Sequence, residues 1–146
     1  MPGCDDGAMD PVYALTALGL LGTGTVLALA AVLCRAGPSR GARFWARTAG
    51  AGHRGGHDYG EVAVLVVLPL IAQTLLVAGA VAGLFAVDLL RGPVAAVLVP
   101  FAVVAEVLVW AVLLVATGYR AIMPLWIYPA WLRPQRRHER DLIRSR

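Results

Sequence analysis

The sequence predicts an all-α integral membrane protein with three transmembrane helices, and two observations support this fold class. First, 59% of the 146 residues are hydrophobic and the mean hydropathy is +0.71, which is too apolar for a soluble domain of this size. Second, the apolar residues form three blocks, 12–34, 62–87 and 94–118, each with the ~20 residues that cross a bilayer. Only polar loops and tails remain, so no separate catalytic domain is expected.

The distribution of arginine predicts the orientation of these three helices. All 13 basic residues are arginine: five lie between the first two blocks, seven follow the third, only Arg91 lies in the turn between the second and third, and none precedes the first. By the positive-inside rule, residues 1–11 form an extracytoplasmic tail, whereas the loop 35–61 and the tail 121–146 are cytoplasmic. Arginine without lysine, together with abundant alanine, glycine and valine, is typical of a G+C-rich bacterial genome. We therefore expect a multi-pass protein of the bacterial plasma or inner membrane.

The connections and the C-terminal region complete the predicted topology. The turn at 88–93 is short, so the second and third helices, within a transmembrane domain spanning 12–120, form an antiparallel hairpin. Cys4 and Cys34 then lie on opposite sides of the bilayer, too far apart for a disulfide. Repeated prolines disfavour helix after residue 121. The segment that begins at residue 121 is expected to lie at the membrane interface, where its aromatic residues anchor it in the headgroup layer. These residues are Trp126, Tyr128 and Trp131. A basic tail with a short helix follows.

One acidic residue, Glu106, lies near the middle of the third block. An ionised carboxylate facing lipid there costs about 2.5–3.5 kcal/mol, so this side chain needs a partner. Gln73 and Glu106 are each fifteen residues from the hairpin turn, which places them at the same depth and makes a hydrogen bond available. Trp110, one turn further, can shield the carboxyl group. The expected intramembrane polar cluster comprises Glu106, Gln73, Thr74, Thr23 and Thr25.

Two prolines within the apolar blocks interrupt helical hydrogen bonding. Pro69 has no N–H to donate to the Leu65 carbonyl, and Pro100 leaves the Ala96 carbonyl without its usual donor. At membrane depth, such carbonyl groups persist where neighbouring side chains or water supply a hydrogen bond. The core of the bundle is therefore expected to admit water.

Small residues provide candidate surfaces for helix packing. In a membrane, small side chains let two backbones approach closely and gain dispersion contacts. Gly79 and Gly83 form a GxxxG pattern in the second block. The full set of expected packing positions is Gly19 in the first block, Ala72, Gly79 and Gly83 in the second, and Ala95 and Ala102 in the third.

The sequence favours no enzyme, metal or nucleic-acid chemistry. His53 and His57 could combine with Asp58 and Glu61 in a metal site, but the intervening glycines disfavour the helical i, i+4 geometry that would bring both imidazoles together, so a solvated loop is favoured. No nucleophile–base pair and no phosphate-binding loop is recognisable. We predict no catalytic residues, no metal and no cofactor. The arginines flank membrane spans, and we expect no nucleic-acid partner.

The third block resembles part of a known family. Residues 105–120, AEVLVWAVLLVATGYR, with Glu106 near the start, are similar to the last helix of the small three-helix subunit of proton-pumping NADH:quinone oxidoreductases. The layout of three spans, a long inner loop and a basic inner tail is also similar. The chain departs from the family in having no Tyr-Glu-Cys-Gly-type signature in the first loop and only Gln73 where the family carries Phe-Asp-x-Glu. This resemblance implies a divergent subunit of that type.

These observations lead to two functional hypotheses. Three helices cannot cover all of their small-residue faces and also provide every hydrogen-bond partner for a buried acid. This favours an accessory or structural subunit of a larger membrane complex, or a homo-oligomer. The alternative is an ion- or proton-coupled transporter or channel subunit that uses Glu106. The lipid bilayer is a partner in both. The arginines set topology in the simpler interpretation and also bind anionic lipid in the other.

Overall fold

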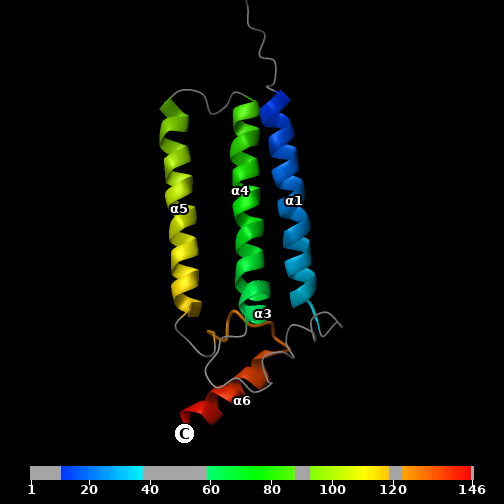
Figure 1. Cartoon of the computed structure of the whole chain (residues 1–146), viewed down its shortest axis with the longest axis vertical. Coiled ribbons are helices and arrows are strands. Elements are labelled where there is room, and N and C mark those ends of the chain that lie inside the picture. Colours follow the sequence, from blue (N-terminus) through cyan, green and yellow to red (C-terminus); the bar gives the residue numbers. More distant parts are fainter. Residues whose placement is uncertain (1–10, 38–58, 88–92, 119–122, 146) are drawn as a thin grey trace, which may run out of the picture.

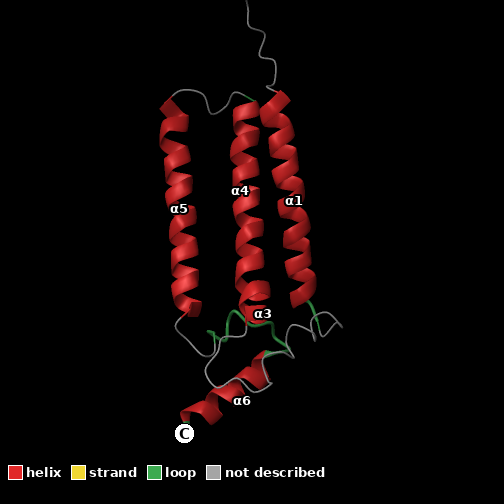
Figure 2. Ribbon diagram, viewed as in Figure 1, coloured by secondary structure: helices red, strands yellow, loops and turns green. Residues whose placement is uncertain are grey.

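The computed structural model describes residues 11–37, 59–87, 93–118 and 123–145, and these ranges contain helices and turns but no strand. α3, η2 and α4 follow one another without a break and form one continuous rod (Figure 1, Figure 2). The elements in chain order are α1 (Pro11–Arg35), α3 (Tyr59–Val62), the π-helix η2 (Ala63–Val67), α4 (Leu68–Ala86), α5 (Pro93–Gly118) and α6 (Arg133–Arg144).

Three of these helical segments are long and apolar enough to cross a membrane: Pro11–Arg35, Gly60–Ala86 and Pro93–Thr117. The prediction of three apolar helices at these positions is confirmed. α4 lies between α1 and α5, and α6 lies across the end of the bundle at which α1 and α5 end (Figure 1). We call this the α6 end.

α1 and α4 pack against each other along a seam of small residues. The small residues that each helix buries recur every seven positions: Ala17, Gly24 and Ala31 on α1, and Ala72, Gly79 and Ala86 on α4. The approach is close, since a Cβ atom on Gly79 would lie 2.8 Å from Leu21 Cγ, and one on Gly24 would lie 2.9 Å from Leu76 Cγ. Only glycine fits at these two positions without a shift of the partner helix.

The seam corrects one predicted packing position. Ala72 and Gly79 are buried in it, and a Cβ atom on Gly83 would contact Ala17 at 3.8 Å. Gly19, however, is exposed and has no atom within 4 Å of a built Cβ. The prediction for Gly19 is wrong because two residues turn a helix by about 200°, which carries Gly19 to the face opposite Ala17.

α5 is attached to the other two helices far less tightly. No residue in its most apolar 18-residue window is buried, whereas 28% of the corresponding window of the Gly60–Ala86 helix is. The side chains that connect α5 to α4 are therefore few, and they include the polar residues described below.

The C-terminal region, residues 123–145, forms a cap on the α6 end. Pro134 starts α6 within its first turn, where a missing N–H costs nothing. The preceding turns contribute apolar side chains to a compact core beneath η2 and the start of α4. This core contains Leu65, Val66, Leu70, Met123, Ile127, Tyr128 and Leu132.

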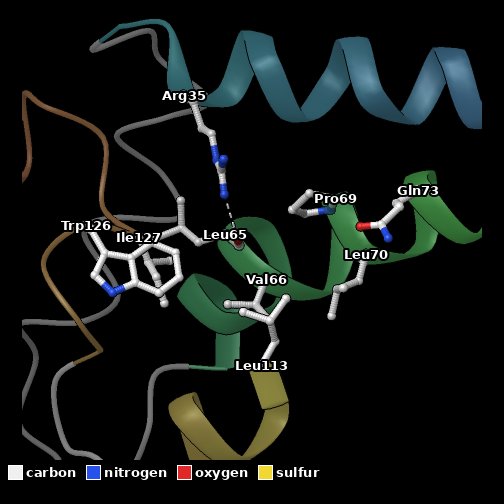
Figure 3. A pocket seen from close by; sticks show the side chains of 9 residues that line it. All are labelled: Arg35, Leu65, Val66, Pro69, Leu70, Gln73, Leu113, Trp126 and Ile127. Carbon is white, nitrogen blue, oxygen red and sulfur yellow. Dashed lines mark hydrogen bonds between the residues drawn. The ribbon is translucent and has the colours of Figure 1, made fainter. Parts of the chain in front are cut away.

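The π-helix η2 comes directly before Pro69. In it the N–H of Leu68 donates to the carbonyl of Ala63, one residue further back than in an α-helix. Arg35, the last residue of α1, donates from Nη2 to the Leu65 carbonyl at 2.6 Å (Figure 3). A neighbouring side chain thus supplies the donor that Pro69 cannot, and the expectation that water enters the core stays a prediction. α5 continues as a helix through Pro100.

Candidate functional site

The centre of the bundle contains a hydrogen-bonded group that joins α5 to α4. Gln73 Nε2 donates to Glu106 Oε1 at 3.2 Å, and the Thr74 hydroxyl lies 3.1 Å from Glu106 Oε2. Trp110 Nε1 donates to Thr74 Oγ1 at 3.0 Å. We call Glu106, Gln73, Thr74 and Trp110 the Glu106 cluster. The hydrogen bond that equal depth predicted between Gln73 and Glu106 is present.

The Thr74 hydroxyl has a choice of acceptors. It lies 3.1 Å from the Leu70 carbonyl and 3.1 Å from Glu106 Oε2, but a hydroxyl carries one proton. The hydroxyl therefore donates to one of these two oxygens at a time, while it accepts the hydrogen bond from Trp110 Nε1.

Two of the five residues expected in the cluster lie apart from it. Thr23 and Thr25 are exposed on α1 and donate to carbonyl groups one turn back, Gly19 O at 2.8 Å and Leu21 O at 2.7 Å. A threonine in a helix commonly satisfies its hydroxyl in this way. Because α1 packs on α4 through its small-residue face, these hydroxyls do not reach Glu106.

An open apolar groove of about 700 Å³ lies between α1, α4 and α5. Tyr13 and Phe85 stand at one end, with their rings stacked at 5.9 Å between centroids. The Glu106 cluster stands at the other, where Glu106, Thr74 and Trp110 line the groove. The wall between them is apolar and includes Ala78, Ala82, Val99, Ala102 and Val103. The groove thus leads along α5 to a single carboxyl group.

The predicted packing positions on α5 are less enclosed than those on α4. Ala102 is partly exposed and lines the groove. Ala95, about two helical turns earlier on α5, is also partly exposed. Neither is buried in a seam like that between α1 and α4.

A second polar group lies in the cap. Glu61 and Arg136 are 5% and 4% exposed and form an ion pair through Glu61 Oε1 and Arg136 Nη2. Arg136 Nη1 pairs with Glu139, and the Tyr128 hydroxyl donates to Glu61 Oε2 at 3.2 Å. This cap network ties the C-terminal region to the start of the α3–η2–α4 rod.

Burial and charge shift the pKa values in the cap. Burial, and then the charge of Glu61, raise the pKa of Tyr128 above its usual value. Burial lowers the pKa of Arg136, but its hydrogen bond to Glu139 and the charge of Glu61 outweigh burial and raise the pKa overall. Tyr128 is therefore neutral, and Arg136 is a cation.

The cap network was not predicted from the sequence. The sequence places Glu61 beside the histidines of the first loop, but His53, His57 and Asp58 lie outside the described residues. Arg136 follows Glu61 by 75 positions. A local pattern cannot link residues that far apart, although an acidic residue at the edge of an apolar block does indicate a need for a partner.

The three expected headgroup anchors have different surroundings. Trp126 is 67% exposed and can face a headgroup layer. Trp131 is partly buried, and Tyr128 is only 2% exposed. The expectation that the Tyr128 side chain faces headgroups is therefore wrong, because its ring packs in the core beneath η2 and its hydroxyl bonds to Glu61.

No protein-family model, curated protein or solved structure matches this chain. The resemblance of residues 105–120 to an oxidoreductase subunit stays a sequence prediction.

Proposed function

We propose that this chain is a multi-pass membrane protein of a bacterial cell membrane that serves as an accessory or structural subunit of a larger membrane complex. Its three apolar helices suit a multi-pass protein. In the proposed orientation the α6 end, with the arginine-rich cap, is cytoplasmic. The observation that carries the proposal is the open groove beside α5, with the Glu106 cluster at its end.

The groove supports a protein partner because of how the small residues are used. α1 and α4 already bury their small faces against each other in the seam. The small residues of α5 remain partly exposed, and Ala102 lines the groove. Since small side chains in a membrane favour close helix contact, a helix from another protein, or from a second copy, fits this surface.

The Glu106 cluster supports a structural role for the acid. Its carboxyl oxygens find their partners on α4, at Gln73 and Thr74. The cluster helps to position α5 at the centre of the bundle, while Val109 and Leu113 pack against the core at the α6 end. The cluster thus holds the groove open at a defined width, and a partner helix would meet a preformed surface.

A photo-cross-linking amino acid in place of Val103, which lines the groove and is 57% exposed, tests the proposal in living cells. The matched control is Val115, which is 61% exposed and outside the groove. We expect a protein adduct from position 103 and none from position 115. Mass spectrometry then identifies it: an adduct of twice the 15.4 kDa chain mass shows a homo-oligomer. Lipid adducts alone at both positions would contradict a subunit role.

The alternative function, ion or proton transport through Glu106, has one observation in its favour: the carboxyl group lines an open groove. Glu106→Gln separates the two functions, because glutamine can keep hydrogen bonds to Gln73 and Thr74 but cannot release a proton. The purified chain and the variant are reconstituted in vesicles with a pH-sensitive dye. Proton flux in the native chain that the variant lacks would favour transport; equal traces support the structural role.

The two cysteines provide a test of the proposed orientation. A thiol reagent that does not cross membranes is applied to intact spheroplasts of a Cys34→Ala variant and of a Cys4→Ala variant. We expect labelling at Cys4 and none at Cys34, which lies at the α6 end of α1. The reverse pattern would place the cap outside and contradict the positive-inside assignment.

A further inference from the structure

A second hollow, the Arg35 pocket, lies at the α6 end between the end of α1, the start of α4 and the cap (Figure 3). Its volume is about 200 Å³. We propose that this pocket binds an anionic phospholipid, with the phosphate at Arg35 and the upper part of one acyl chain along the apolar wall. The proposal depends on the chain spanning a membrane, but not on the partner proposed for the groove.

Arg35 is positioned to bind an anion. Its hydrogen bond to the Leu65 carbonyl uses one of the five N–H donors of the guanidinium group and holds the side chain over the pocket (Figure 3). The planar group is suited to a phosphate, which accepts two parallel hydrogen bonds from it. The π-helix and Pro69 create this arrangement, because they present the Leu65 carbonyl to the end of α1.

The rest of the pocket favours a lipid over a free anion. Apart from Arg35 and Gln73, its lining is apolar and includes Leu70, Leu113 and Ile127. Trp126, exposed at the rim, suits the headgroup layer. The pocket is too small for a whole lipid, so only the part next to the phosphate lies within it and the remainder lies on the outer surface of the helices.

One local effect opposes the binding of an anion. The C-terminus of α1 carries about half a negative charge from its carbonyl groups. The full positive charge of Arg35 lies at the same end and outweighs it. In the proposed orientation, this end also faces the cytoplasmic leaflet, where a basic pocket between helices meets anionic headgroups.

The test measures lipid binding to the purified full-length chain in a mild non-ionic detergent. Phosphatidylglycerol or phosphatidylcholine is added at equal mole fractions, and native mass spectrometry counts the lipids retained. Free glycerol phosphate is a third arm. We expect the chain to retain phosphatidylglycerol in preference to phosphatidylcholine, and Arg35→Gln to reduce that preference about fivefold, the factor that corresponds to ~1 kcal/mol for one arginine near an anionic surface.

Two further variants keep the test decisive. Arg137→Gln removes the same charge from the exposed side of α6, outside the pocket, and should retain the preference. Leu113→Phe fills the pocket without changing charge and should weaken retention, even if Arg35→Gln fails to fold. Equal retention of both lipids by the native chain would overturn the proposal, as would an Arg137→Gln effect equal to that of Arg35→Gln. Competition by free glycerol phosphate at the same concentration would show an anion site and overturn the lipid assignment.

Discussion

Replacing Glu106 by leucine should loosen α5 against α4 near the middle of the bundle. The change removes both acceptor oxygens, so the hydrogen bonds from Gln73 and Thr74 are lost. Hydrogen bonds between helices in a membrane contribute about 0.6 kcal/mol on average and up to ~1.7 kcal/mol. Two of them give an expected loss of about 1–3 kcal/mol in the free energy of unfolding. The hydrogen bond from Trp110 to Thr74 remains in this variant, and Val109 and Leu113 still pack against the core beneath η2, so the loss is local to the centre of the bundle.

Glutamine at position 106 is the matched comparison. Its carbonyl oxygen can accept from Gln73, its amide can donate to Thr74, and the Thr74 proton can then go to Leu70. We expect Glu106→Gln to stay within about 0.5 kcal/mol of the native chain, less than the average worth of one such bond. The contrast therefore isolates the hydrogen bonds from the size of the side chain.

The assay combines reversible unfolding in mixed detergent and dodecyl sulfate micelles with a distance measurement. Spin labels at the exposed positions Ala80 on α4 and Val104 on α5 report the separation of the two helices. The distance distribution should broaden in Glu106→Leu and stay narrow in Glu106→Gln. A leucine variant with native stability and a native distance distribution would refute the view that this cluster positions α5. Equal losses in both variants would refute the assignment of hydrogen bonds.

Three other perturbations have expected outcomes. Gly79→Ala places a methyl group 2.8 Å from α1, and overpacking of this kind should lower the free energy of unfolding by about 1–3 kcal/mol. Arg136→Met removes the Arg136 cation from the buried Glu61 carboxylate and should cost about 3 kcal/mol, measured as faster proteolysis of the cap. Because the pKa of Tyr128 is raised in the folded protein, the neutral Tyr128 side chain stabilises the fold. This contribution to the free energy of unfolding is complete below the ordinary tyrosine pKa of about 10. It is lost as the pH rises through the pKa of the folded protein.

Each of these predictions has a control. Gly22→Ala, with nothing within 4 Å of the added carbon, should leave stability unchanged or higher. Arg137→Met, on the exposed side of α6, should not speed proteolysis. Tyr128→Phe should remove one step above pH 10 from the ultraviolet titration of the tyrosines. A step missing from below pH 10 instead would contradict the raised pKa.

Part of the Glu106 cluster could be predicted from the sequence because depth in a hairpin depends only on counting residues from the turn. Counting placed Gln73 and Thr74 beside Glu106, and proline chemistry identified the Leu65 carbonyl as a group in need of a donor. Depth also favoured Thr23 as a member, but it could not show that the rotation of α1 turns this hydroxyl away. Depth is a property of one helix, whereas contact depends on the rotation of two.

The amino-acid sequence by itself determined the three apolar helices and their ends, because hydropathy, helix rise and proline chemistry act over a few neighbouring residues. Only the tertiary structure decided that α1 packs through Ala17 and Gly24 instead of Gly19, and that Glu61 is paired with Arg136. Both outcomes depend on how helices rotate about their axes and on where the chain returns many residues later. Those are properties of the packed molecule, which no local pattern specifies.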